Sequence, residues 1–594
     1  MGVVSRAAPT EREYAHRHAR KAALRCRGRP VAADDGRPWS DGGVMPRLVI
    51  GKGPRDTPLS RRPVPCRAHV VLPVTMALLL LIVAADSVPA MGSAQPSSVP
   101  QRAQLIGDLG TNLGPTRVPR VSFLAQLHSV DYPSCLESWA ASAGLDVRWS
   151  RGESWVSISG PPTAVDRAFG VSIDAYRDAG GQVGWVANRP ARVPASACGE
   201  VSGIGDIHSF VRPTALGDMT LGASSPGLSP AQLMHAYDAT PLASRGLAGQ
   251  GQTVVFFEGD AYSSSDLKAF ASSIHHSLNL VVPLGNLGSD EKESTMDIET
   301  VHEIAPSAKL VDINLLSSRF KDTSTAGTFE AAFAFARRHW PGAIWSISLG
   351  ICEHDANIFN RTDLSIMNEA ISTAEVGGTT VFAASGDTGG LDCMPPNDAG
   401  RSPVGSWEGV LVPASLPAVT AVGGTTLSTT TTGAYLGETT WTEPLLLQGS
   451  GGGLSRVFAR PTWQTGPGTG GALDGSEMRQ VPDIAADADP ATGNDIIVDR
   501  SVNTGGGTSL STPIWAGFTT LIDQYLGTQG GHAVGFFNPE LYRLAETSPP
   551  YRPLHDIRVD GNDFYPATPG YDMVTGLGSP DVWNLARDLA LAER

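Results

Sequence analysis

The chain has 594 residues, of which 41% are hydrophobic, and this is enough for several domains with a large core. Its formal net charge is −15, and the acidic excess lies mainly after residue 228. Because phosphate binding needs stripes of basic side chains, this acidic chain with few lysines argues against nucleic acid as a partner and fits a secreted protein.

The first hundred residues indicate export. Arg61, Arg62 and Arg67 precede the apolar run VVLPVTMALLLLIVAA, and the small-residue stretch DSVPAMGSAQPSS follows it. This order predicts a signal-peptide region over 61–94, and hence a secreted protein after cleavage. An uncleaved run would leave a membrane-anchored form, although the run is short and interrupted for a membrane span. Residues 1–60 lack periodicity and are expected to be a disordered or untranslated extension.

Residues 100–212 are predicted to form a small α/β domain. The strand-like segments RVSFLAQL, LDVRWS, SWVSISG and VSIDAYR occur together with the helix-like segments SCLESWAASAG and PTAVDRAFG. The Pro- and Gly-rich junction SSPGLSPAQL follows this domain. We therefore predict a linker over 213–228.

Residues 229–594 are predicted to form one α/β domain. Uniformly apolar segments such as QTVVFFEG, KLVDINLL, AIWSISLG and TTVFAASGD alternate with helical segments. This alternation favours a doubly wound parallel sheet, whose active site lies beyond the carboxyl ends of the strands. SISLG and FAASGD both end in polar or glycine residues at that edge.

Four of the six cysteines follow the predicted cleavage point. An even number in an exported chain suggests disulfides, and pairing Cys135 with Cys198 and Cys352 with Cys393 would keep each bridge within one domain. The sequence contains no Cys-x-x-Cys or His-Glu-x-x-His motif, so a zinc site is not expected.

The stretch TGGGTSLSTPIWAGF presents a candidate nucleophile, Ser509. The glycines allow a tight turn, and Pro513 is predicted to open a helix, so that free N–H groups lie near the Ser509 hydroxyl. A serine needs a base to remove its proton, and the sequence offers two kinds of candidate.

Histidine is the first kind of base to consider, because Ser-His-Asp arrangements are common. His302, in ETVHEIAPSA, is the nearest candidate, but no His-Gly-Thr-His segment of the subtilisin type is present. The segment SGDTGG is similar to a chymotrypsin-like motif, but Thr388 takes the place of the serine, and we reject that interpretation.

A pair of acids is the stronger candidate. Glu293 and Asp297 in EKESTMDIETVHEIAPSAKL are four residues apart, so on a helix they share one face. Two neighbouring carboxylates cannot both ionise easily, and such a pair can share a proton and act as a base in acid, where a histidine would be protonated.

This combination resembles the sedolisin family of serine-carboxyl peptidases. The resemblance extends over nearly everything after the signal region and implies a subtilisin-like catalytic domain preceded by a ferredoxin-like activation prodomain. The matching segments are SWVSISGPPTAVDRAFG, SPAQLMHAYDATPLASRGLAGQGQTVVFFE, SISLGICE, VFAASGDTGG, PASLPAVTAVGGTTL, SGGGLSRVFARPTWQ, VPDIAADADPATG and GGTSLSTPIWAGF.

The resemblance also implies roles for individual residues. Ser509 would be the nucleophile and Glu293 the general base, and Asp297 would orient Glu293 and share its proton. Asp387, in ASGDTGG, would stabilise the oxyanion together with the Ser509 backbone N–H. Glu258, at the end of the first strand of the domain, would extend the proton network.

The C-terminal segment HDIRVDGNDFYPATPGYDMVTGLGSPD is rich in oxygen ligands and tight turns. The resemblance implies that this segment binds one calcium ion, which suits such ligands. By position, the ligands would be two carboxylates and three backbone carbonyls, from Asp556, Ile557, Thr568, Gly570 and Asp572.

We expect a secreted, acid-acting serine peptidase that is made as a proenzyme and acts as a monomer on protein or peptide substrates. Its own prodomain would act as an intramolecular inhibitor. Cleavage preference stays open, as does the choice between an endopeptidase and a tripeptidyl-peptidase. Two alternatives remain, namely a catalytically silent secreted binding protein on the same fold and a neutral-pH subtilisin-like protease that uses His302.

Overall fold

The computed structural model describes residues 110–592, except for gaps at 178–182, 194–197, 210–213, 216–226, 290–291, 321–322, 354–359, 394–407, 471–476, 548 and 563. These residues all belong to one compact unit, 91–594. The predicted extension at 1–60 and the signal region at 61–94 lie outside the described residues. Among the helices of the described part, none is long and apolar enough to cross a membrane.

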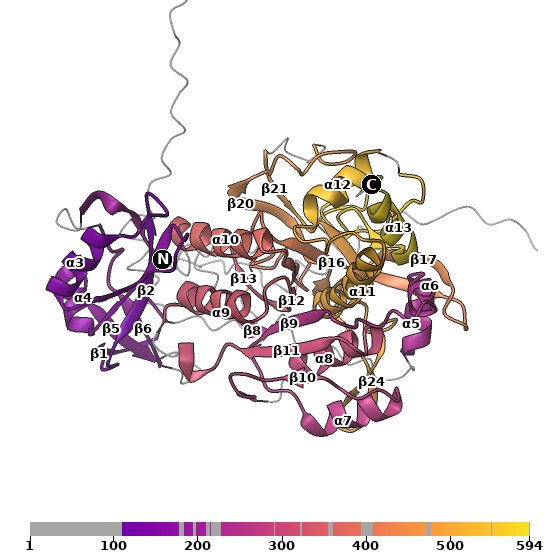
Figure 1. Cartoon of the computed structure of the whole chain (residues 1–594), viewed down its shortest axis with the longest axis horizontal. Coiled ribbons are helices and arrows are strands. Elements are labelled where there is room, and N and C mark those ends of the chain that lie inside the picture. The colour runs from indigo at the N-terminus through magenta and orange to yellow at the C-terminus, as the bar shows by residue number, and fades with distance from the viewer. Residues whose placement is uncertain are drawn as a thin grey trace, which may run out of the picture. The chain divides into compact units, whose positions relative to one another are not determined.

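The first described part, up to residue 209, is a small α/β structure (Figure 1). Its main sheet has the order β3-β4-β2-β7 and is antiparallel throughout. This order, with a helix after β2 and another after β4, is the split βαβ arrangement of ferredoxin-like domains. The elements are β1 (Thr111–Pro115), β2 (Val121–Leu127), α3 (Ser134–Ala143), β3 (Asp146–Arg148), β4 (Trp155–Gly160), α4 (Pro162–Phe169), β5 (Ile173–Arg177), β6 (Val183–Ala187), η1 (Cys198–Glu200) and β7 (Val201–Ile204).

The predicted strands and helices of this part are present, but the sequence did not indicate β1, β6 or β7. Strands β1, β5 and β6 form a separate three-stranded sheet beside the main one. Buried apolar side chains from both sheets and both helices share one core, including Phe123, Leu136, Val165 and Trp185.

The rest of the described chain is built on one large sheet with the order β10-β11-β9-β12-β14-β16-β17, and β22 also pairs with β16. Strands β16 and β17 pair antiparallel, and all the other pairs, including β16 with β22, are parallel. The predicted doubly wound parallel sheet is therefore confirmed. Its strands are β9 (Thr253–Glu258), β10 (Leu280–Val281), β11 (Lys309–Asn314), β12 (Ile344–Ile347), β14 (Thr380–Ala384), β16 (Thr420–Thr429), β17 (Tyr435–Thr440) and β22 (Ile484–Asp487).

Helices cover both faces of this sheet. On β9, Val254 and Phe256 belong to a core shared with α8 (Glu293–Ile304) and α11 (Thr508–Thr528). Val255 and Phe257 belong to the opposite core, shared with α9 (Thr325–His339) and α10 (Arg361–Val376). Because successive side chains of a strand point to opposite faces, apolar residues on both faces make the strand continuously hydrophobic, as the sequence shows.

Short elements complete this part of the chain. The helices are α5 (Pro230–Ala236), α6 (Thr240–Ala243), α7 (Ser264–Ser273), η2 (Ser318–Phe320), α12 (Asn538–Thr547) and α13 (Val582–Ala592). The strands are β8 (Thr214–Ala215), β13 (Leu349–Cys352), β15 (Leu411–Val412), β18 (Thr442–Glu443), β19 (Gln448–Gly449), β20 (Gly453–Ala459), β21 (Met478–Val481), β23 (Asp495–Val498), β24 (Ser501–Thr504), β25 (Leu554–His555) and β26 (Ser579–Pro580).

One predicted disulfide is confirmed, because Cys352 and Cys393 are bonded. Cys135 is also disulfide-bonded. The side chain of Cys198 lies outside the described residues, so the pairing of Cys135 with Cys198 stays a prediction.

Polar contacts connect the small α/β part to helix α10. Gln126 Nε2 donates to Glu369 Oε2 at 3.0 Å, and Ser154 Oγ also donates to the Glu369 carboxylate. The backbone N–H of Asp206 donates to Asp363 Oδ2 at 2.7 Å. Carboxylates on α10 therefore accept hydrogen bonds from three positions of the small part.

Candidate active site

Helix α8 carries both candidate acids, at its first and fifth residues. The exposed fraction of Glu293 is 2% and that of Asp297 is 0%, and every residue of the helix is buried. The spacing of four residues places the two carboxyls on one face. The predicted pair is therefore not a solvated surface pair but is held within the protein.

Burial is the main cause that raises the pKa of the Glu293 carboxyl well above its usual value, and the neighbouring Asp297 adds to the shift. The Ser509 hydroxyl lowers the pKa of Glu293, whereas Asp387 raises it, so both groups lie near Glu293. Among the described residues, however, Ser509 Oγ has no partner within 3.5 Å in hydrogen-bond geometry. The effect of Ser509 on the pKa of Glu293 nevertheless indicates that the hydroxyl lies close to this carboxyl.

Asp297 is held by a serine that the sequence did not single out. Ser348 Oγ donates to Asp297 Oδ2 at 2.6 Å, between the end of β12 and the start of β13. Burial raises the pKa of Asp297 well above its usual value, and the hydrogen bond from Ser348 opposes this shift. A hydroxyl just beyond a parallel strand was the available signal, since that edge of the sheet is where ligands bind.

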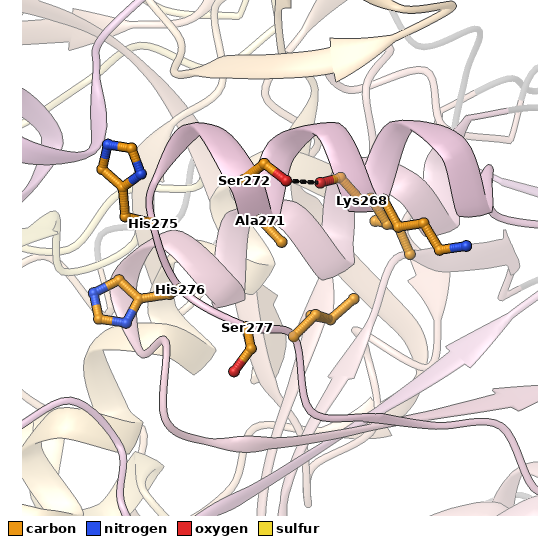
Figure 2. Close-up of a pocket in the computed structure, with 8 residues that line it drawn as sticks. Lys268, Ala271, Ser272, His275, His276 and Ser277 are labelled. Carbon is orange, nitrogen blue, oxygen red and sulfur yellow. Dashed lines mark hydrogen bonds between the residues drawn. The ribbon is translucent and has the colours of Figure 1, made fainter.

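His302 lies elsewhere on α8. It follows Glu293 by about two and a half helical turns and so lies on the opposite face. Its Nε2 is 3.4 Å from the carbonyl oxygen of His276, and burial lowers the pKa of its ring. Near His276, an open hollow of about 810 Å³ lies beside α7 and is lined by His275, Lys268 and their neighbours (Figure 2). None of the candidate catalytic residues lines this hollow.

The nucleophile turn connects β24 to α11. Gly507 has φ +85°, and a Cβ added there would lie 2.6 Å from Asp387 Oδ2, so only glycine allows the Asp387 carboxyl to pack against this turn. The helix begins at Thr508, which places Ser509 in its first turn with an exposed fraction of 0%. The expected helix N-terminus at Ser509 is therefore present.

The predicted start at Pro513 is wrong, because Pro513 lies inside α11. A proline has no N–H, so the carbonyl of Ser509, four residues earlier, loses its helical partner. Ser348 Oγ, whose proton is donated to Asp297, also lies 3.4 Å from that carbonyl oxygen. One serine thus contacts both Asp297 and the backbone of the nucleophile.

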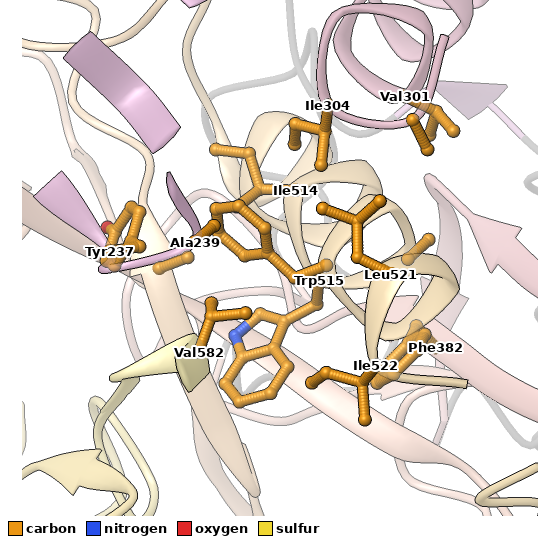
Figure 3. Close-up of a cluster of buried hydrophobic side chains, with 14 of the residues drawn as sticks. Tyr237, Ala239, Val301, Ile304, Phe382, Ile514, Trp515, Leu521, Ile522 and Val582 are labelled. Carbon is orange, nitrogen blue, oxygen red and sulfur yellow. The ribbon is translucent and has the colours of Figure 1, made fainter. Parts of the chain in front are cut away.

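Helix α11 is anchored by one of the two large cores of this part of the chain. Ile514, Trp515, Leu521 and Ile522 pack among side chains from α8, the sheet and the C-terminal helix (Figure 3). The indole of Trp515 also donates to the carbonyl oxygen of Ala485 at 2.8 Å. This packing fixes the helix that carries Ser509.

Asp387 follows β14 and contacts the same turn. Its Oδ1 accepts hydrogen bonds from the N–H and the Oγ1 of Thr508, both at 2.7 Å. Burial raises the pKa of Asp387 to about 6, although both hydrogen bonds from Thr508 oppose this shift. With Oδ1 occupied as an acceptor, the proton of a neutral Asp387 is expected on Oδ2. Thr508 was not predicted, because its role depends on a tertiary contact.

Further buried acids adjoin the pair. Glu258 ends β9, and neither of its carboxyl oxygens has a hydrogen-bond partner among the described residues. Burial raises its pKa well above the usual value, and Asp297, Asp260 and Asp312 add to the shift. The structure thus brings Glu258 to the Glu293 pair, together with two aspartates that were not predicted. Acidic residues in otherwise apolar strands and strand ends were the available signal.

Strand β13, the middle strand of the three-stranded sheet β15-β13-β8, directly follows Ser348. Its residues Leu349 and Gly350 pair antiparallel with β8 (Thr214–Ala215), and its other end pairs with β15. An extended segment of the chain between the small α/β part and the large domain therefore lies along the strand next to the candidate active site.

In the predicted calcium-binding loop, Asp556 and Asp572 both accept hydrogen bonds from the short segment 568–570. The N–H of Gly570 donates to Asp556 Oδ2 at 3.1 Å, and the N–H of Thr568 donates to Asp572 Oδ2 at 3.0 Å. Arg558 forms an ion pair with Asp556 at 2.6 Å.

The exposed fraction of Ile557 is 3%, and burial raises the pKa of Asp572 to about 6. No group of three or more His, Cys, Asp or Glu side chains suited to a metal occurs in the described part of the chain. The groups predicted as ligands are nevertheless all oxygen donors, and this chemistry fits a hard cation.

Comparisons with known proteins agree with this architecture. Residues 285–534 match the model of the subtilase family. The chain is 31% identical over 471 residues to kumamolisin from Bacillus sp. (strain MN-32), a match that covers 71% of this chain and 76% of kumamolisin. It is 29% identical over 457 residues to sedolisin from Pseudomonas sp. (strain 101), and this match covers 73% of this chain and 74% of that sedolisin. Tripeptidyl-peptidase 1 from Homo sapiens is 24% identical over 437 residues, and this match covers 67% of this chain and 72% of that protein.

Among solved structures, Pseudomonas sedolisin, a serine-carboxyl proteinase complexed with two molecules of pseudo-iodotyrostatin, has a similar fold. The TM-score is 0.52 at 26% sequence identity, and the match covers 63% of this chain and 100% of that chain.

Proposed function

The chain belongs to the sedolisin family of serine-carboxyl peptidases, and from this premise we propose that it hydrolyses peptide bonds through an acyl-enzyme on Ser509. It is a serine-type hydrolase that acts on protein or peptide substrates. The observation that carries the proposal is the buried Glu293–Asp297 pair that faces Ser509.

In the proposed reaction, Ser509 Oγ attacks the carbonyl carbon of the scissile bond while its proton passes to Glu293. The C–N bond then breaks, and Glu293 gives this proton to the departing amine. A water molecule next attacks the acyl ester and loses a proton to Glu293, which returns it to Ser509 as the acid product leaves. Asp297 shares the proton of Glu293 and, with Ser348, fixes its orientation.

Asp387 is the proposed oxyanion donor. When it is neutral, its Oδ2 proton can be donated to the negative oxygen of the tetrahedral intermediate, and the Ser509 N–H is the second donor. The pKa of about 6 keeps this carboxyl protonated in acid. Together with a base made of two acids instead of an imidazole, this supports an enzyme that works at low pH.

We further propose that residues 100–212 are an activation prodomain and that 213–228 are the linker cut during maturation of a secreted proenzyme. The pairing of Thr214–Ala215 with Leu349–Gly350 supports this, because it places a segment of the predicted linker along strand β13, next to the candidate active site. Release of the prosegment would have to break the hydrogen bonds that the carboxyls of Glu369 and Asp363 accept from it.

We also propose that the loop of Asp556 and Asp572 binds one calcium ion. The residues that would hold it are these two carboxylates and the carbonyls of Ile557, Thr568 and Gly570. Bound calcium would cross-link residues 556–557 to 568–572 and so stabilise the C-terminal part.

The decisive experiment incubates the purified proenzyme at pH 4 with a peptide library and with a peptide aldehyde, and analyses both by mass spectrometry. We expect cleaved peptides and an aldehyde adduct at Ser509, and neither in S509A. A parent protein that is folded and matured but gives no fragments and no adduct would show a silent binding protein. Activity that survives in E293Q but is lost in H302A would favour the histidine mechanism.

A further inference from the structure

The N-terminal end of helix α8 lacks a cap of its own. Lys292, at the N-cap position, has φ +82° and makes no side-chain cap hydrogen bond. The first N–H groups of a helix need acceptors, and residues such as Ser, Asp or Asn normally supply them at that position. Because Glu293 is the first residue of this helix, the orientation of its carboxyl depends on what holds the first turn.

Asp260 supplies the missing acceptor from a different part of the chain. The N–H of Ser294 donates to Asp260 Oδ1 at 3.2 Å, and Ser294 Oγ donates to the same oxygen. Asp260 lies two residues after the end of β9, so this contact joins the first turn of α8 to the carboxyl edge of the sheet.

Asp260 is itself firmly held. Asn314 Nδ2 donates to the carbonyl oxygen of Asp260 at 2.7 Å, and the N–H of the next residue, Ala261, donates to the carbonyl oxygen of Ser289 at 2.9 Å. The exposed fraction of Asp260 is 2%. Because Asp260 binds Ser294, the residue that follows Glu293, it is suited to setting the position of the Glu293 carboxyl.

Four buried acids interact electrostatically with Asp260. Glu293 and Asp297 face it from α8, Glu258 from β9 and Asp312 from β11, and Asp260 raises the pKa of all four. Lys292, at the N-cap of α8, forms an ion pair with Asp499. The charge of Asp260 therefore acts on the base pair, whereas it does not contribute to the pKa shift of Asp387.

We propose that Asp260 is a positioning residue, which caps α8 from the β9–α7 connection and thereby fixes the Glu293 carboxyl toward Ser509. This inference rests on the proposed function of Glu293. It predicts two separable effects, one from the hydrogen bonds of Asp260 and one from its charge.

The test compares D260N, D260A and S294A with the parent enzyme after maturation. We expect D260A to lower kcat about 10- to 100-fold with little change in KM, since small misplacements of a catalytic group cost up to about 100-fold. D260N keeps an acceptor oxygen, so it should retain most of kcat while the acid limb of the kcat/KM profile moves to lower pH. The alkaline limb should stay in place. S294A, which loses one donor, should show a smaller loss of kcat than D260A.

The matched control is D266A. Asp266 is also buried and accepts two backbone N–H groups, from Asp499 and Arg500. It is not one of the main causes of the pKa shifts of Glu293 and Asp297. Normal kcat in D260A, or an acid limb that does not move in D260N, would overturn the inference. So would equal losses in D260A and D266A with unchanged pH profiles. Full activity in E293Q, measured alongside, would instead refute the proposed function.

Discussion

Replacing Asp387 by Asn separates the two tasks that its carboxyl has in the proposed mechanism. The Asp387 Oδ1 accepts two hydrogen bonds from Thr508, and an amide oxygen can accept both. The proton on Oδ2 is available only below the pKa of about 6, whereas an amide N–H is available at every pH. D387N should therefore keep the structure of the turn and change only the pH dependence of the second donor.

The magnitude follows from the pKa. For a carboxyl with a pKa of about 6, the protonated fraction is about 99% at pH 4 and about 1% at pH 8. If the neutral acid is the donor, kcat/KM of the parent should fall about tenfold for each pH unit above 6. D387N should lose this alkaline limb and keep activity within about tenfold of the parent at pH 4. D387A, which removes the donor, should lose about 10²- to 10³-fold at every pH.

The assay is kcat/KM for a fluorogenic peptide between pH 3 and 8, with the matured parent, D387N and D387A. Active-site titration with a peptide aldehyde at pH 4 corrects each value for the fraction of folded enzyme. An alkaline limb at the same pH in D387N as in the parent would refute the reasoning, since the limb would then belong to another group. A loss of less than about tenfold in D387A would likewise rule out Asp387 as an oxyanion donor.

Further predictions concern the base pair, stability and calcium. E293Q and D297N should each lower kcat by about 10²- to 10⁴-fold with little change in KM, as measured by steady-state kinetics at pH 4; a loss only in KM would contradict the assignment. Burial raises the pKa of Glu299 to about 9, so the folded state keeps a proton that the unfolded state loses above about pH 4.5. Stability should therefore be greatest in acid and fall by up to about 1.4 kcal/mol per pH unit for each such carboxyl, until the pH exceeds 9. E299Q should flatten this dependence in thermal melts from pH 4 to 8, and an unchanged slope would argue against it. Adding EGTA should lower the melting temperature of the parent, and D556A together with D572A should remove that sensitivity; an EGTA effect that persists in the double variant would place the calcium elsewhere.

The sequence predicted those parts of the site that depend on local spacing. Glu293 and Asp297 share a helix face because of their separation along the chain, and Ser509 lies in a turn whose glycines mark it. Ser348 and Asp260 could not be recognised, because each contributes through contacts with residues far away in the chain. Their polar side chains just beyond strand ends mark the edge of the sheet where ligands bind, but do not show which residues they contact.

Helix boundaries show the same limit. The prediction that a helix opens at Pro513 used a sound local preference for proline in the first turn. The structure begins the helix five residues earlier, at Thr508, because Asp387 accepts the Thr508 N–H and the packing of Trp515 holds the rest. Ser348 Oγ lies 3.4 Å from the carbonyl that proline leaves without its helical partner. Tertiary partners, which no local pattern contains, moved the boundary.

Helix α8 also contacts the chain segment that precedes the nucleophile Ser509. Beyond the catalytic pair, Glu299 Oε2 accepts the N–H of Ile497 at 2.7 Å, and Glu303 accepts a hydrogen bond from Asn494. These contacts hold the β23–β24 hairpin, which leads directly into the Ser509 turn. The same buried helix thus carries the carboxyls that act on Ser509 and the carboxyls that hold the segment before it. Because burial raises the pKa of both sets, alkaline pH would charge both. A rise in pH should therefore loosen the nucleophile segment, even though the charged Glu293 carboxylate is the form that acts as the base.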